Sequence, residues 1–128
     1  MQSLANVFKA LSDETRLQIL ALILNLEEAC VCDVMQVCGI TQSKASRHLR
    51  YLLHAGFLQD RREGTWIYYS IRPTPPPPTA AVLAANRELL TSLWTDGLKK
   101  RLEEWNFRKQ KENSCSNTPV ENKCGKRS

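Results

Sequence analysis

Two cysteines separated by one residue, Cys30 and Cys32, are the side chains whose type and spacing most clearly suggest chemistry. Thiolate is the softest protein ligand and prefers soft ions to calcium or magnesium. Both residues lie in the turn before a short helix expected from Asp33 to Val37, or at its first residue, where a helix N-terminus lowers thiol pKa. The pair indicates a site for one thiophilic ion. The alternative is one small buried side chain with an incidental neighbour.

A second group of functional side chains follows about ten residues later, on a helix that Thr41 caps and that ends at Ala55. Its polar side carries short polar and cationic groups of the kind that read base edges in the major groove. Between Thr41 and Arg62 the only acid is Asp60, whereas an ordinary solvated face, the alternative interpretation, would mix signs. We expect DNA contacts from Gln42, Ser43, Lys44, Ser46, Arg47, His48 and Arg50, and from Arg61 and Arg62 near the tip of a following hairpin.

The surrounding elements are those of a DNA-binding domain. Apolar residues recur at helical spacing in the first segment, and the next helix is apolar nearly all round, which is typical of a central buried helix. The expected elements are helices over residues 4–11, 17–26, 33–37 and 41–55, and strands over 57–62 and 66–71. This order predicts a mainly α fold with a β-hairpin wing, a winged helix-turn-helix.

The C-terminal part predicts dimerisation. A stiff proline-rich spacer over 73–78 precedes one long helix over about 79–107, whose apolar stripe is too long for the preceding elements to cover. An isologous contact would bury it, so we expect a homodimer through the N- and C-terminal helices. Residues 1–107 then form the DNA-binding and dimerisation domain, and 108–128 a flexible basic tail.

Composition limits the function classes. A chain of 128 residues allows one domain. Its net charge of +5 mildly favours a polyanionic partner. No apolar run reaches membrane-spanning length, and the N-terminus lacks signal-peptide features, so we expect a cytoplasmic protein with reduced thiols. Neither histidine is placed as a base, and no phosphate loop or paired carboxylates occur, which argues against an enzyme.

Several ordered motifs resemble the arsenical-resistance repressor (ArsR/SmtB) family. The opening stretch 8–17, the metal-box-like stretch 29–34, the recognition-helix residues 43 and 46–49, and the wing stretch 60–69 match it in order, and the likeness spans residues 3–72 closely. The resemblance implies a homodimeric repressor that binds double-stranded operator DNA without a cofactor. It also implies release from DNA when a metal or metalloid binds the cysteine pair.

The third sulfur ligand is left open by the sequence. The arsenic-responsive pattern of the family often has a third cysteine where this chain has Met35, whose thioether supplies no anionic sulfur. Cys38 is six residues past Cys32, about 10 Å away in an unbroken helix, whereas sulfurs that share one ion lie within roughly 4 Å. A tail cysteine is therefore preferred, Cys115 slightly over Cys124, with Cys38 as the rival.

The resemblance also orders the candidate inducers. The two histidines, His48 and His54, both lie in the helix that is expected to contact DNA, which argues against a zinc or nickel site on the last helix. Cadmium sensors that resemble this box use cysteines from an N-terminal extension, which we do not expect here. We therefore expect As(III) or Sb(III), then Cd(II) or Pb(II). A thiol-redox switch on the same scaffold and a winged helix that binds another protein are the remaining alternatives.

Overall fold

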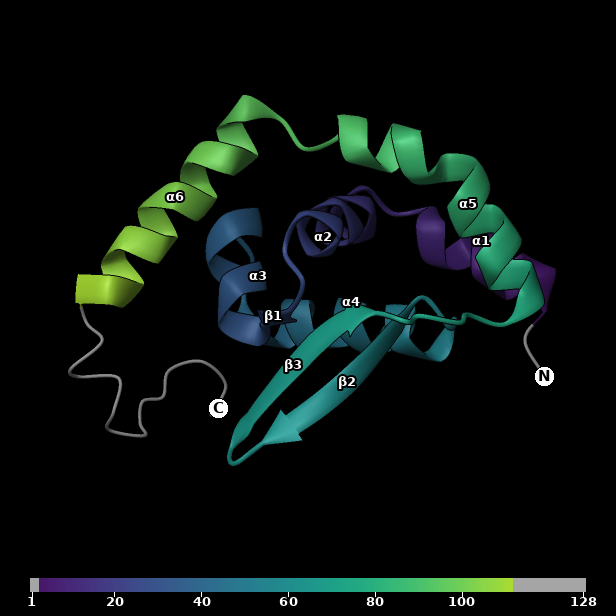
Figure 1. Cartoon of the computed structure of the whole chain (residues 1–128), viewed down its shortest axis with the longest axis horizontal. Helices are drawn as coiled ribbons and strands as arrows, with labels where there is room; N and C mark the ends of the chain where they lie inside the picture. Colours follow the sequence, from purple (N-terminus) through teal and green to yellow (C-terminus); the bar gives the residue numbers. More distant parts are fainter. Residues whose placement is uncertain (1–2, 112–128) are drawn as a thin grey trace.

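The computed structural model describes residues 3–111, which form six helices and a three-stranded antiparallel sheet whose β2–β3 hairpin projects from the helical body (Figure 1). The elements are α1 (Leu4–Leu11), α2 (Glu14–Asn25), β1 (Ala29–Cys30), α3 (Val31–Cys38), α4 (Gln42–His54), β2 (Leu58–Glu63), β3 (Trp66–Ile71), α5 (Pro77–Ser92) and α6 (Asp96–Lys111). The predicted winged helix-turn-helix is confirmed. None of these helices has the length and apolar character that crossing a bilayer requires.

The first two helices begin at capping side chains. The Ser3 hydroxyl accepts a hydrogen bond from the backbone N–H of Asn6 (3.1 Å), and the Asp13 carboxylate accepts one from that of Arg16 (3.1 Å). Residues 19–23 of α2 are all buried, which agrees with its expected role as the central helix.

The helices α3 and α4 form the helix-turn-helix. Gly39 ends α3 in the left-handed conformation (φ 69°), and its N–H donates to the carbonyl of Met35 (2.9 Å). Thr41 caps α4 by accepting a hydrogen bond from the backbone N–H three residues later (3.3 Å). The threonine cap agrees with the sequence prediction, but α3 (Val31–Cys38) is longer at both ends than the predicted helix over 33–37.

The hairpin wing carries a third strand that the sequence did not predict. Strands β2 and β3 pair with Leu58 opposite Ile71, and β1 pairs with the other edge of β3, so that Cys30 lies opposite Tyr68. The sequence pattern does not reveal β1, because a strand of two residues is too short to show alternation. This strand joins the first thiol to the wing.

The single long helix predicted over about 79–107 is instead two helices, α5 and α6, separated by residues 93–95. Thr95 starts the second helix by accepting a hydrogen bond from the backbone N–H of Leu98 (3.2 Å). Gly97 in its first turn disfavours continuation of the preceding helix. The sequence does not reveal this break, because the apolar residues before and after it keep the spacing of one continuous helix.

The predicted proline spacer over 73–78 also ends early. Pro77 and Pro78 are the first two residues of α5. The first turn of a helix tolerates proline, because its N–H would lack an intrahelical partner and its fixed φ suits the helix.

Most of the apolar stripe on the last two helices is buried within the chain, although the sequence predicted a dimer contact for it. The helix α5 packs on α1 and α2, and α6 packs on α3 (Figure 1). Leu83, Leu90 and Leu98 are at most 8% exposed, whereas Leu89 is 66% exposed. The break over 93–95 allows the two helices to follow different sides of one core, which a straight helix could not do.

Candidate functional site

Cys30 and Cys32 lie together in a small buried cluster that is separate from the main core. Cys30 is the N-cap residue of α3, Cys32 lies in its first turn, and their exposed fractions are 7% and 5%. Trp105 of α6 is buried against them, and Trp66 and Tyr68 of the wing pack at the edge of the cluster. Three elements distant in sequence thus enclose the thiol pair.

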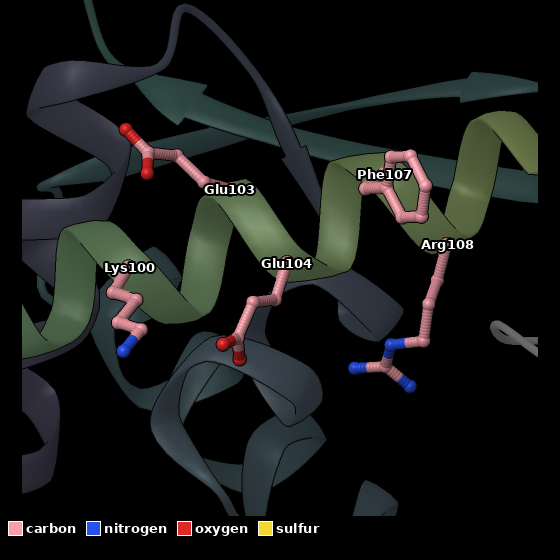
Figure 2. Close-up of a pocket in the computed structure, with 5 residues that line it drawn as sticks. All are labelled: Lys100, Glu103, Glu104, Phe107 and Arg108. Atoms are coloured by element: carbon pink, nitrogen blue, oxygen red, sulfur yellow. The ribbon is translucent and has the colours of Figure 1, made fainter.

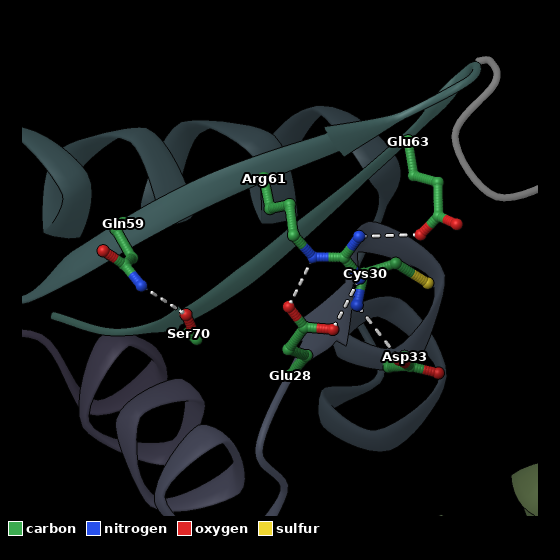
Figure 3. Close-up of polar contacts among 7 residues, drawn as sticks. All are labelled: Glu28, Cys30, Asp33, Gln59, Arg61, Glu63 and Ser70. Atoms are coloured by element: carbon green, nitrogen blue, oxygen red, sulfur yellow. Dashed lines mark hydrogen bonds and ion pairs between the residues drawn. The ribbon is translucent and has the colours of Figure 1, made fainter. Parts of the chain in front are cut away.

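The carboxylate of Asp33 organises this cluster. Its Oδ2 accepts a hydrogen bond from the backbone N–H of Cys30 (3.0 Å; Figure 3). Its Oδ1 accepts one from the indole N–H of Trp105 (2.7 Å) and one from Nζ of Lys109 (2.8 Å). Burial, and secondarily Cys30, raises the pKa of Asp33, while Lys109 opposes the rise. One side chain therefore joins the start of α3 to α6.

Cys38 is separated from the pair. It lies at the other end of α3, six residues or about 9 Å of helical rise from Cys32, and it packs against the main core. Burial raises the pKa of the Cys38 thiol to about 11, opposed by Arg101, which disfavours the thiolate that an ion requires. Cys115 and Cys124 lie outside the described residues.

The donor set suits a thiophilic ion but is incomplete. Two thiols within three residues, in one buried cluster at a helix N-terminus, match the chemistry of a soft ion. No group of three or more His, Cys, Asp and Glu residues in the described part of the chain could hold a metal ion. Cys30 and Cys32 therefore need at least one further donor from elsewhere.

The polar face of α4 is presented to solvent. Ala45, Leu49 and Leu52 are buried and fix the helix on the core, and Ser46 is half-buried at the boundary. The exposed residues among those predicted to contact DNA on this helix are Gln42, Ser43, Lys44, Arg47 and Arg50. Three of these five are cationic, which suits a surface that approaches phosphates and base edges.

His48 has a different environment from the exposed residues of α4. It is half-buried, and its Nδ1 lies 3.2 Å from Nη1 of Arg16. The same guanidinium donates to the carbonyls of Lys9 (3.0 Å) and Ala10 (2.8 Å) and stacks over the ring of Tyr51 (4.1 Å to the centroid). This arginine ties α1 and α2 to α4 and turns the histidine toward the body of the domain.

Arg61, on the wing, is held by two carboxylates. Its guanidinium donates to both oxygens of Glu28 (2.8 Å each) and to Glu63 (2.7 Å), as Figure 3 shows, and it lies 4.9 Å from the ring centroid of Tyr68. These hydrogen bonds raise the pKa of Arg61 and lower that of Glu28. This side chain is therefore directed toward the face of the sheet that carries the thiol cluster.

Arg62 lies on the other face of the sheet, because neighbouring residues in a strand alternate. There the pKa of Tyr69 is raised by burial and by Asp60, and lowered by Arg50 of α4 and Arg62 of the wing. The two cations thus act on the same tyrosine. The structure brings Arg62 toward the recognition helix and separates it from Arg61.

A pocket of about 510 Å³ lies on α6 (Figure 2). It is lined by Lys100, Glu103, Glu104, Phe107 and Arg108. These residues carry charges of both signs and no thiol, so this pocket differs in chemistry from the thiol cluster.

Three functional residues were not predicted from the sequence. Trp105 and Lys109 contact Asp33 across 72 and 76 residues, a separation that local patterns do not reveal. Trp105 was placed only on the apolar stripe. Arg16, which orients His48, carried no signal beyond its place in the family-like opening motif.

The helix-turn-helix, the wing and the exposed cationic face of α4 define the class of winged helix-turn-helix DNA-binding regulators. Residues 13–60 match the family described as bacterial regulatory protein, arsR family. The chain is 40% identical over 114 residues to the arsenic resistance transcriptional regulator ArsR1 of Pseudomonas putida, an alignment that covers 86% of this chain and 85% of that one. The chain belongs to the ArsR family.

Shorter alignments connect the chain to two further relatives. It is 49% identical over 71 residues to the arsenic resistance transcriptional regulator ArsR2 of Pseudomonas putida, covering 56% of this chain and 62% of that one. It is 50% identical over 68 residues to a cadmium resistance transcriptional regulatory protein CadC homolog of Staphylococcus aureus, covering 52% and 55%. The chain thus spans less than two thirds of the length of these two relatives.

The fold also matches solved structures. A homodimeric winged helix-turn-helix DNA-binding domain of Mycobacterium bovis, described as a possible ArsR-family transcriptional regulator, superposes with a TM-score of 0.55 and 34% identity. The match covers 66% of this chain and 75% of that one. The expected fold class is therefore confirmed by a related structure as well as by the elements themselves.

Proposed function

We propose that this protein is a transcriptional repressor that binds operator DNA and is released when As(III) or Sb(III) binds Cys30 and Cys32. The observation that carries the proposal is the position of the two buried thiols at the N-terminus of α3, the first helix of the helix-turn-helix. A sensor at that point is part of the element that positions the recognition helix.

The chain would act as a homodimer. Leu4 and Phe8 of α1 are 53% and 54% exposed, Leu89 of α5 is 66% exposed, and these two helices pack on each other. An apolar surface shared by the first and fifth helices suits an isologous contact. Such a dimer would present two recognition helices to major grooves one turn, about 34 Å, apart.

Release would begin at the cap of α3. The backbone N–H of Cys30 is fixed by Asp33, and Cys32 lies in the first helical turn, so drawing both sulfurs to one ion disturbs this turn. Since α3 packs on α4, a shift of the first helix moves the exposed face of the second. Lys44 and Arg47 would then no longer keep their register in the groove.

We favour Cys115 as the third donor. The helix α6 ends at Lys111, and the side chain of Lys109, two residues earlier, contacts Asp33 beside the thiol pair. Cys115 follows four residues after Lys111, and these residues span at most about 14 Å. Closing the longer loop to Cys124 costs more entropy, and Cys38 would require α3 to unwind.

A cadmium- or lead-responsive repressor is the second candidate. It is favoured by the similarity to the cadmium resistance regulator, and by the preference of thiolates for soft ions in general. A thiol-redox response on the same scaffold would instead form a disulfide without any ion, and intact mass measurement would detect it.

The test is a gel-shift assay on DNA from upstream of the gene, titrated with arsenite, antimonite, cadmium, lead and zinc. We expect arsenite and antimonite to release the wild-type protein and Cys38→Ser, the matched control, but not the double variant Cys30→Ser/Cys32→Ser. All three proteins should bind DNA equally without an ion. Release of the double variant by arsenite, or failure of every ion to release the wild type, would contradict the proposal.

A further inference from the structure

The helix α6 closes the thiol cluster from outside the helix-turn-helix. Trp105 is 8% exposed and packs with Cys30 and Cys32, which are themselves 7% and 5% exposed. The indole packs over both sulfurs, and the described part of the cluster holds no third donor, so an ion that needs both sulfurs and a further donor requires this cover to move. The site, as observed, is closed.

Polar contacts hold α6 on α3 along its length. Near its start, Arg101 donates to the carbonyl of Val37 (3.2 Å). One turn later, Trp105 donates to Asp33 (2.7 Å). After a further turn, Lys109 forms an ion pair with the same carboxylate (2.8 Å). The spacing 101, 105, 109 places all three donors on one helical face.

Few apolar side chains of α6 are buried. Of its residues whose side chains are described, Leu98 and Trp105 are buried and Leu102 is half-buried, while the others are exposed. The helix follows the break over 93–95, and α3 is the element on which it chiefly packs. A helix with few apolar contacts and a break at its start is the kind of element that opens locally without global unfolding.

We propose that α6 is a latch over the thiol pair, and that Trp105 and Lys109 are positioning residues that keep it closed through Asp33. The inference rests on the proposed function, in which Cys30 and Cys32 hold the inducer. The latch opens before both thiols can be reached. When the first turn of α3 is rearranged, Asp33 leaves its place and α6 is released.

The geometry makes the two events depend on each other. One oxygen of Asp33 caps the N–H of Cys30, while the other accepts from both groups of α6. Any movement of this carboxylate that disturbs the α3 cap therefore also breaks the two hydrogen bonds that hold the latch.

The experiment measures alkylation of the full-length, ion-free protein by iodoacetamide at constant pH, with each cysteine quantified by peptide mass spectrometry. The variants are Lys109→Met, which removes the ion pair, and Trp105→Phe, which removes the indole donor and keeps an aromatic ring. Lys100→Met removes the same charge from the pocket-lining face of α6 and is the matched control.

We expect Cys30 and Cys32 to react at least about tenfold faster in both variants, which corresponds to about 1.4 kcal/mol, and within about twofold of wild type in the control. Unchanged rates in both variants would overturn the latch. So would an increase matched by an equal change in the global unfolding constant from urea titration, because the thiols would then be reached by unfolding alone.

Failure of the latch and failure of the proposed function are distinguishable. The alkylation assay contains neither ion nor DNA, so it reads the latch even if no ion releases the operator. Conversely, unchanged alkylation would leave release by arsenite intact and assign α6 a purely structural role.

Discussion

Replacing Arg62 by alanine should weaken operator binding and its salt dependence, whereas replacing Arg61 should change them far less. The two substitutions remove the same charge from adjacent residues, so each is the control for the other. Arg62 shares a neighbourhood with Arg50 of the recognition helix, whereas Arg61 is held at 2.7–2.8 Å by Glu63 and Glu28 on the opposite face of the sheet. We therefore expect the former to contribute more to phosphate binding, because Arg61 would first have to leave two carboxylates.

The magnitude follows from counterion release. Removing one phosphate-binding arginine from each protomer, and so two from the dimer, lowers the slope of log affinity against log salt by about 1.8. Between about 50 and 200 mM salt, the affinity of the wild type should fall about tenfold further than that of Arg62→Ala. For Arg61→Ala the slope should change by less than about 0.9.

The assay is fluorescence anisotropy of a labelled operator duplex at four or more salt concentrations. The two variants also need equal urea unfolding midpoints, so that a folding defect is not mistaken for weaker phosphate binding. Equal slopes for both variants, or a larger change for Arg61→Ala, would refute the division of the wing into a DNA face and a thiol face.

Further predictions concern stability, each measured by urea unfolding. Thr79→Val should cost about 1–3 kcal/mol, because the buried hydroxyl donates to the Ala55 carbonyl (2.7 Å) and its removal leaves that acceptor unpaired; an unchanged stability would contradict this. Gly56→Ala should cost more than Gly64→Ala, which should cost about 1–2 kcal/mol: both have positive φ, but only at Gly56 would a Cβ meet a proline carbon, at 2.9 Å. Burial lowers the pKa of His48, so the unfolded chain takes up a proton that the folded chain does not, and stability falls as pH drops below about 7; His48→Gln should flatten this fall, and an unchanged pH profile would exclude the histidine as its cause.

The elements with local signals were predictable from the sequence. Thr41 marked the start of α4 because capping depends on residues within one turn. The wing was predictable because its second strand, β3, is rich in aromatic and β-branched residues.

The parts that depend on distant contacts were not predictable. The strand β1 has two residues, and its pairing with Tyr69 and Tyr68 lies about forty residues away. The break between α5 and α6 was hidden by a continuous apolar stripe. The sequence could name the cysteines, but the cover supplied by Trp105 required the fold.

The two arginines of the wing show the same limit. Their charge suggested DNA contact for both Arg61 and Arg62, since sequence alone gives alternation but not which face meets the recognition helix. The position of Glu28 just before β1, beside Arg61, distinguishes the two side chains in the folded chain.

Occupancy of the Cys30–Cys32 site and operator binding are proposed to oppose each other energetically. The most direct measurement is arsenite affinity, by isothermal titration calorimetry, for the protein alone and for the protein saturated with operator duplex. Linkage requires DNA to weaken arsenite binding by the same factor by which arsenite weakens DNA binding; a factor of about 100 is close to 3 kcal/mol. We expect equal factors well above one. Arsenite affinity that is the same with and without operator would contradict it.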